Sequence, residues 1–180
     1  MDNNQTVLLI SEEYIKENSG INKNIWGDYL TPAITQSQDI NLAWILGSRL
    51  YCKICREVLE DSVEERFDDL ITGLIQPYLM YQTIVNLIPI VSSKITNLGT
   101  VISNDEHIVN LSQAEREDLI YRYQTRGGHY EFILKNYLSN HKDLYPELQP
   151  CEDCGCDYVE PHLDSNPASP VFLMGKRTIA

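Results

Sequence analysis

The fold is decided by residues 70–93, LITGLIQPYLMYQTIVNLIPIVSS, which contain no charged side chain. A membrane span needs about 20 predominantly apolar residues, so this run is long enough to be one. It also carries polar residues and two prolines, Pro77 and Pro89, and its apolar residues recur at helical spacing. The apolar positions at this spacing begin with Phe67, just before the run, and continue with Leu70, Ile71, Leu74, Tyr78, Tyr81, Val85 and Ile88. We therefore interpret the run as the central buried helix of a bundle rather than a membrane span.

Serine residues indicate where the other helices begin. Ser11 precedes Glu12 and Glu13, which suit the first turn of a helix. Residues 62–65 and 112–115 both fit the capping-box pattern. The sequence predicts helices over residues 12–18 and from 24 or 25 to about 39. After a tight connection at 42–47, a third helix is capped by Ser48 and runs to about 60, and a fourth runs from 62 through the uncharged run with bends near Pro77 and Pro89. The last runs from 112 to about 138 and is interrupted by Gly127-Gly128, a pair that marks either close packing or a bend.

Two segments do not follow the helical pattern. Residues 95–103 place β-branched side chains around Asn97-Leu98-Gly99, which predicts a hairpin or a projecting loop. Helical periodicity stops past Tyr145-Pro146. We therefore predict an all-α fold: a kinked helical bundle over residues 1–148, with a projecting β-hairpin or loop near 95–110 between the two long helices. An irregular extended C-terminal tail follows over 149–180 and is expected to be mobile in a free monomer.

The charge composition limits the kinds of partner that the chain can bind. The chain has 180 residues and a formal net charge of -12, from 26 acidic and 14 basic residues. Binding to nucleic-acid phosphates or to an anionic membrane surface needs a basic face, so both are excluded as main functions. Met1–Gln5 has no basic region of the kind that opens a signal peptide. The chain has five cysteines, an odd number that cannot all pair in disulfides within one chain. We expect reduced thiols and a cytoplasmic environment.

No catalytic motif stands out in the sequence. It lacks a phosphate-binding loop, a dinucleotide glycine fingerprint, a nucleophile elbow and a metalloprotease motif. The four histidines are scattered without partners at fixed spacing: they are His107, His129, His141 and His162. The sequence therefore predicts a protein without enzymatic activity.

The cysteines divide into two groups. Cys151, Cys154 and Cys156, followed by His162, could close a tetrahedral zinc site, and Cys151 and Cys154 have the usual knuckle spacing. Cys154 and Cys156 are only two apart and no second such pair follows, so an acidic tail with reduced thiols and no cofactor is the favoured interpretation. Cys52 and Cys55 are expected to be helix-packing residues.

The order of several short segments carries a family resemblance. In chain order they are Ser11–Lys16, Tyr29–Ile34, Gln38–Ile40, Ile45–Tyr51, Ile75–Tyr81, Leu87–Pro89, Lys94–Gly99, Tyr137-Leu138 and Tyr145–Glu147. Together they resemble the head–tail connector, or neck adaptor ring, proteins of tailed bacteriophages, in particular those of crAss-like phages. The likeness covers roughly residues 5–148 and rests on many weak matches, so the tail lies outside it.

The resemblance implies a structural virion protein without catalytic activity. Such subunits form a homo-oligomeric ring of about twelve copies at the neck. The ring contacts the portal protein and other neck or tail proteins, and DNA passes through its channel without specific binding. Localisation would be the virion, after assembly in the host cytoplasm. An acidic chain suits such a conduit, because a lumen that attracted phosphate would retain the genome.

Two apolar segments are candidates for the subunit interface. The first comprises Ile95, Leu98, Val101 and Ile102 of the expected hairpin, and the second is the tail tetrad Val171, Phe172, Leu173 and Met174. Apolar residues of this kind favour aggregation unless a partner covers them. The competing hypothesis is a cytoplasmic zinc-stabilised helical binding module whose acidic surface meets a basic partner.

Overall fold

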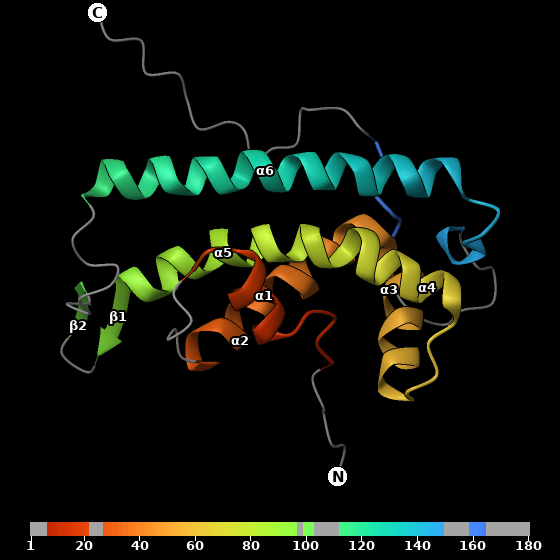
Figure 1. Ribbon diagram of the computed structural model, residues 1–180, viewed down its shortest axis with the longest axis horizontal. Helices are drawn as coiled ribbons and strands as arrows, with labels where there is room; N and C mark the ends of the chain where they lie inside the picture. The colour runs from red at the N-terminus through yellow and green to blue at the C-terminus, as the bar shows by residue number, and fades with distance from the viewer. Residues whose placement is uncertain (1–6, 22–26, 97–98, 103–111, 150–158, 165–180) are drawn as a thin grey trace, which may run out of the picture.

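The computed structural model describes residues 7–21, 27–96, 99–102, 112–149 and 159–164. This part of the chain is mostly helical, which confirms the predicted all-α class. The helices are α1 (Glu12–Asn18), α2 (Gly27–Gln36), the π-helical η1 (Ser37–Leu42), α3 (Ala43–Leu59), α4 (Glu65–Leu70), the π-helical η2 (Ile71–Ile75), α5 (Gln76–Ser92), α6 (Gln113–Asn140) and the 3₁₀ turn η3 (Pro146–Leu148). Figure 1 shows α6 lying along α5, with α1, α2 and α3 on the other side of α5.

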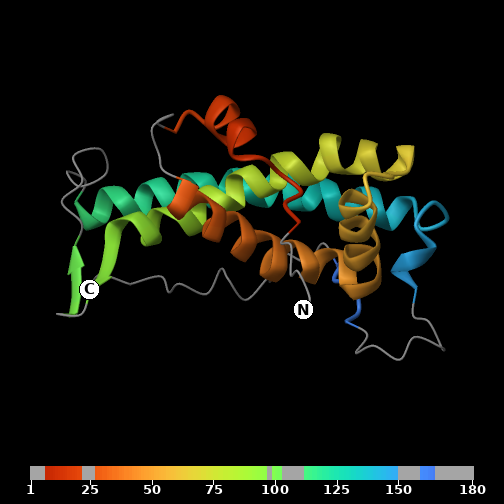
Figure 2. The ribbon, with the colours of Figure 1, turned by 90° about the horizontal axis from the view of Figure 1, so that it is seen from below.

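A short antiparallel ladder follows α5. Strand β1 (Ser93–Thr96) pairs with β2 (Gly99–Ile102), so that Ser93 lies opposite Ile102 and Thr96 opposite Gly99. The ladder lies at one end of the molecule, beyond the end of α5 (Figure 2).

The uncharged run forms the centre of the fold. α4, η2 and α5 succeed one another directly, and Phe67, Ile75 and Leu79 are fully buried. Within the described residues, Glu65–Val91 is the one helix long and apolar enough to span a bilayer, a test that core helices of soluble proteins also pass. Half of its most apolar window is buried inside the molecule. Packing against α2 and α6 accounts for this burial.

The start of the central helix differs from the sequence prediction. α4 begins at Glu65, with Glu64 as an extended N-cap that makes no side-chain capping bond, so the capping box expected at Ser62 is wrong. Glu57 takes over this role from the previous helix, because its Oε2 accepts the N–H of Glu64 at 3.0 Å. The Glu57 side chain is buried, and Lys53 Nζ lies 2.7 Å from its other oxygen.

The last long helix, α6, is continuous. Ser112 caps it as predicted: its Oγ accepts the N–H of Glu115, and the Glu115 carboxylate accepts the N–H of Ser112 at 2.7 Å. α6 passes through Gly127 and Gly128 without a break, so the interruption expected there is wrong, and of the two explanations left open for the pair the structure supports close packing. Close packing explains the first glycine, since a Cβ at Gly127 would lie 3.5 Å from Tyr81 Cβ.

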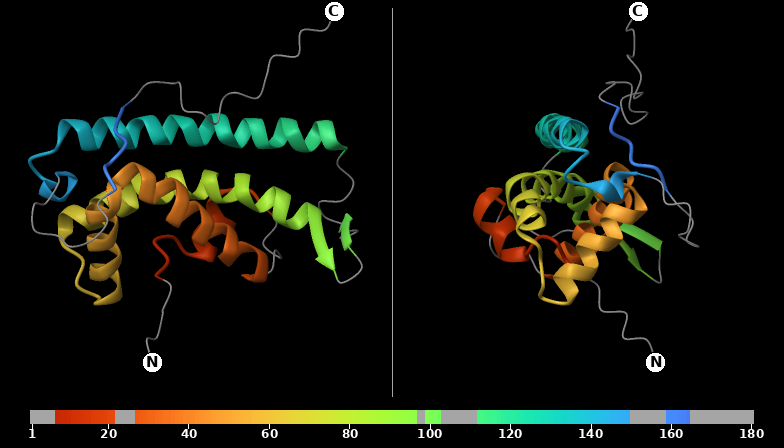
Figure 3. Two further views of the ribbon diagram at one scale, coloured as in Figure 1. Left: turned by 180° about the vertical axis from the view of Figure 1, so that it is seen from behind. Right: turned by 90° about the vertical axis from the view of Figure 1, so that its right-hand side faces the viewer.

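Burial agrees with the expected core at half of the positions. The helical spacing of the two longest helices predicts burial of six residues, which are Leu74, Tyr78, Val85, Tyr123, Tyr130 and Leu134. Tyr78, Val85 and Leu134 are buried, whereas the other three are half-buried. Tyr123 and Tyr130 lie against Tyr81, with ring centroids 6.2 and 5.3 Å from that of Tyr81. α6 covers the bundle from one side only, which leaves the edges of its apolar stripe accessible (Figure 3).

The N-terminal arm, residues 7–10, is held by the side-chain amides of buried Gln38 and half-buried Gln76. Gln38, in η1, accepts the N–H of Leu9 at 2.9 Å and donates to the carbonyl of Val7 at 2.7 Å. From the start of α5, Gln76 donates to the carbonyl of Leu9 at 3.2 Å. Ser11 then caps α1 as predicted, its Oγ accepting the N–H of Tyr14 at 3.1 Å.

Candidate interaction surface

A single glycine interrupts α3. Gly47 has φ 72° and ψ 160°, while the residues on both sides of it are helical. The connection expected over 42–47 is therefore confined to one residue, and Leu42–Leu46 are helical instead. The backbone angles of Gly47 lie in a region that is essentially restricted to glycine.

The break leaves two backbone groups of the helix without their usual partners. In an uninterrupted helix the N–H of Ser48 would donate to the carbonyl of Trp44. Residues 159–164, far along the chain, replace both halves of this bond. Val159 O accepts the N–H of Ser48 at 3.1 Å, and the N–H of His162 donates to Trp44 O at 3.2 Å.

Further contacts fasten the same segment. The N–H of Val159 donates to Ser48 Oγ at 3.0 Å. A Cβ at Gly47 would lie 2.8 Å from Val159 O and 2.9 Å from Pro161 N, so the segment fits only because residue 47 has no side chain. Figure 3 shows residues 159–164 lying beside α3. We call this arrangement the Gly47 clamp; it departs from the expectation that the whole tail is free of the monomer.

The clamp holds an aromatic pair at the surface. The rings of Trp44 and His162 stack with centroids 3.6 Å apart and planes 7° from parallel. Trp44 nevertheless remains 54% exposed, Ile40 one turn earlier 61%, and Val159 43%. We call Ile40, Trp44, Val159 and His162 the Trp44 patch. It is an apolar surface that could bind apolar side chains of another segment.

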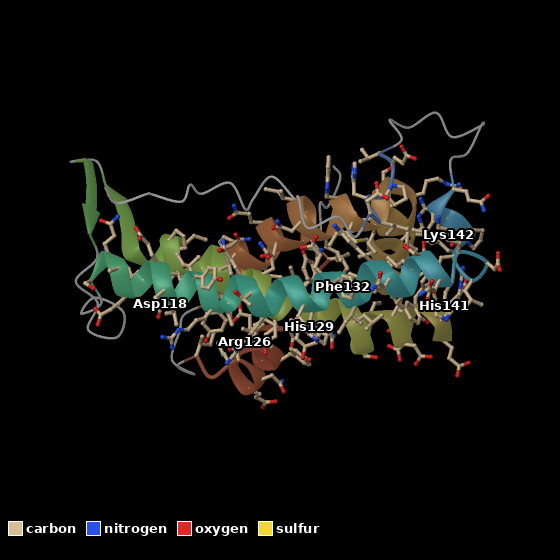
Figure 4. All side chains as sticks on the ribbon, turned by 90° about the horizontal axis from the view of Figure 1, so that it is seen from above. Asp118, Arg126, His129, Phe132, His141 and Lys142 are labelled. Atoms are coloured by element: carbon tan, nitrogen blue, oxygen red, sulfur yellow. The ribbon has the colours of Figure 1, made fainter. Side chains whose placement is uncertain are left out.

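The outer face of α6 also exposes large aromatic side chains, which lie about three helical turns apart. Tyr121 is 62% exposed and Phe132 51% exposed. Asp118, just before Tyr121 in the helix, pairs with Arg122 at 2.6 Å. Figure 4 shows Asp118, Arg126, His129 and Phe132 along this face of the helix. This face carries charges of both signs, among them Asp118 and Arg122.

The predicted metal ligands are only partly visible. His162 is in the Trp44 patch, whereas Cys151, Cys154 and Cys156 lie outside the described residues. Within the parts of the chain that the structure describes, no group of three or more His, Cys, Asp or Glu side chains could hold a metal ion. The zinc hypothesis therefore stays a prediction.

The predicted interface residues are also divided. Ile95 lies on β1, opposite Thr100, while Val101 and Ile102 lie on β2, opposite Lys94 and Ser93. Leu98 and the tetrad Val171, Phe172, Leu173 and Met174 lie outside the described residues.

The two cysteines of α3 differ in environment. Cys52 is exposed, so the expectation that it packs within the bundle is wrong, and Cys55 is half-buried. Burial is the main cause that raises the pKa of the Cys55 thiol to about 11. The neighbouring Tyr51 also has a raised pKa, because of burial and because its hydroxyl donates to Asp39 Oδ1 at 2.5 Å.

Sequence reasoning missed the Trp44 patch. Its members lie at positions 40, 44, 159 and 162, which are far apart in the sequence. The one local signal was the Gly47-Ser48 pair, which suggested a break in the helix near Trp44. Ile40 lies in the π-helical η1, whose wider turn changes which side chains share a face of the helix, and it is 61% exposed.

Comparison with known proteins gives a family but no function. No curated protein and no solved structure matches the chain. One family model, described as a family of unknown function, matches residues 42–158, a range that includes Trp44, Gly47 and all of α5 and α6. Since this match covers more than half of the 180 residues, the chain belongs to the DUF6712 family.

Proposed function

We propose that this chain is a structural virion protein, a subunit of an oligomeric neck ring that joins the portal and capsid to the tail and extends the DNA channel. The proposal rests first on the sequence resemblance to connector proteins described above. It assigns no enzymatic activity to the chain and places it at the head–tail junction after assembly in the host cytoplasm. About twelve copies would form the ring.

The observation that carries the proposal is the Trp44 patch. Three large apolar side chains there are each more than 40% exposed, although the surrounding backbone is fastened by three hydrogen bonds of the Gly47 clamp. Contiguous exposed apolar surface on a soluble protein is typical of a contact site for another chain. A fixed backbone also lowers the entropy lost when a partner binds.

The ladder of β1 and β2 fits the same proposal. We propose that it projects from a kinked helical bundle and contacts a neighbouring chain through Ile95, Leu98, Val101 and Ile102. Its place beyond the end of α5 supports this assignment (Figure 1). Each subunit of a cyclic ring contacts its two neighbours through two different surfaces, and two separate contact segments would provide them.

Charge supports a conduit rather than a DNA-binding ring. Each copy carries a formal charge of -12, so a closed ring would repel phosphate at long range and would let DNA pass without specific binding. We expect the contacts with the portal protein and with other neck or tail proteins to be made at the ends of the ring.

The test is the assembly state of the full chain. Light scattering and electron microscopy of the purified protein, alone and mixed with the portal protein, should reveal a closed ring. A monomer that persists at high concentration and in the presence of portal protein would refute the proposal. Zinc at one equivalent per chain, lost together with structure on chelation, would favour the zinc-module hypothesis instead.

A further inference from the structure

The chain continues from the Trp44 patch into its C-terminal segment. His162 stacks on Trp44 and its N–H is bonded to Trp44 O, and Asp164, the last residue described, follows two positions later. The next sixteen positions, 165–180, contain the tetrad Val171-Phe172-Leu173-Met174. The most apolar segment of the tail therefore begins only seven residues after a fixed point beside an exposed apolar surface.

We propose that the tetrad of one copy docks on the Trp44 patch of the next copy in the assembly. This inference rests on the proposed self-association and names one of its contacts. The tetrad supplies four apolar side chains, and the patch offers Ile40, Trp44 and Val159, each exposed by 43–61%. Covering both surfaces removes apolar area from water, which is the main driving force of such contacts.

The connecting sequence favours a neighbouring copy over the patch of the same chain. Residues 165–170 read SNPASP, and proline fixes its own φ and biases the residue before it toward extended backbone. At about 3.1 Å per residue, six residues would span roughly 20 Å if they were extended, enough to reach beyond the chain's own patch. Docking on its own patch would instead require a reversal within these six residues.

Charge complementarity agrees with this occupant. Lys176 and Arg177 follow the tetrad by two residues. Two exposed carboxylates flank the patch, since Asp39 adjoins Ile40 and Glu160 adjoins Val159. A docked tetrad would bring the two cations near these acids, and a pair of this kind contributes to orientation and to the rate of association.

Trp44 itself can report the docking. The chain has two tryptophans, so Trp26→Phe leaves Trp44 as the only one. In this full-length background, emission from Trp44 should shift to the blue as protein concentration rises through assembly. Phe172→Ser should abolish the shift and weaken self-association about tenfold or more, because the burial of a Phe side chain is lost.

Two further variants make the test specific. Ile40→Ser changes the receiving surface without touching the clamp and should weaken association to a similar degree. Phe132→Ser removes the same kind of side chain from the exposed face of α6 and is the matched control. We expect it to keep the concentration-dependent blue shift of Trp44 emission. Far-ultraviolet circular dichroism checks that each variant keeps its helices.

The outcomes separate this inference from the proposed function. Rings that form normally with Phe172→Ser, and with unchanged Trp44 emission, would overturn the docking and leave the ring proposal standing. A blue shift that depends on Phe172 but not on concentration would place the tetrad on its own patch and would overturn docking between copies. A wild-type chain that stays monomeric would overturn both.

Discussion

Gly47→Ala is the substitution that tests the clamp most directly. With the break retained, alanine would occupy a backbone region that costs about 1–3 kcal/mol for a residue with a Cβ. That Cβ would lie 2.8 Å from Val159 O and 2.9 Å from Pro161 N, so residues 159–164 would have to move. The substitution therefore cannot leave both the break and the clamp as they are.

The alternative is that the new alanine adopts helical angles. The N–H of Ser48 then regains the carbonyl of Trp44, and the chain loses the three hydrogen bonds of the clamp. Hydrogen bonds contribute about 0.5–1.5 kcal/mol each, and alanine gains roughly 1 kcal/mol over glycine within a helix. With helical angles the net cost is therefore about 0–2 kcal/mol, since two hydrogen bonds are lost overall and the helical alanine offsets about 1 kcal/mol. With the break retained it is about 1–3 kcal/mol, so we expect the free energy of unfolding to fall by at most about 3 kcal/mol.

Urea denaturation followed by circular dichroism measures this fall, and hydrogen exchange locates it. The amides of Val159 and His162 donate across the break, so both should lose protection in Gly47→Ala. Gly20→Ala is the matched control, because Gly20 has the same φ of 72° with nothing within 4 Å of an added Cβ. If Val159 and His162 stay protected in Gly47→Ala, the reasoning about the clamp is refuted.

Three further predictions concern the bundle. Although burial alone would raise it, the pKa of Glu57 is lowered in the folded protein, because a backbone N–H and a lysine ammonium stabilise its carboxylate. That stabilisation is present above the unfolded pKa and is lost as pH falls through the folded pKa. Glu57→Gln should therefore destabilise the protein at pH 7 and have little effect in strong acid. Urea titration at both pH values measures the difference. Iodoacetamide at pH 8 should modify exposed Cys52 well before Cys55, whose thiol has a pKa raised to about 11; equal rates by mass spectrometry would contradict this. Leu134→Ala should cost about 2–5 kcal/mol in thermal or chemical unfolding because Leu134 is fully buried, and half-buried Leu74→Ala should cost clearly less.

The features that could be predicted from the sequence are local. Ser11 and Ser112 cap their helices because a serine oxygen reaches an N–H only three residues ahead, and nothing distant competes for it. The uncharged run could be identified as the core helix because its composition admits few other environments. Such inferences need only the residues within a few turns of the chain.

Where prediction failed, a distant group decided the structure. The serine at position 62 has a good capping sequence, but buried Glu57 accepts the N–H of Glu64 and the helix begins later. The sequence left close packing or a bend open at Gly127-Gly128, and only the distant Tyr81 on α5, which packs against Gly127 in a continuous α6, decides between them. The partners of Ser48 and Trp44 lie more than 110 residues further along the chain, so no local pattern could predict the clamp.

The clamp has an energetic consequence for Trp44. A tryptophan side chain can bury about 150–250 Å². At about 25 cal/mol per Å², leaving half of it exposed means that folding gains roughly 2–3 kcal/mol less than full burial would give. His162 covers one face of the ring, and the side chain is still 54% exposed. Within the described part of the chain nothing covers the remainder, so this free energy becomes available when another segment binds. In the proposed ring, Phe172 of a neighbouring copy supplies that cover, and the gain would therefore be measured in assembly rather than in the folding of one subunit.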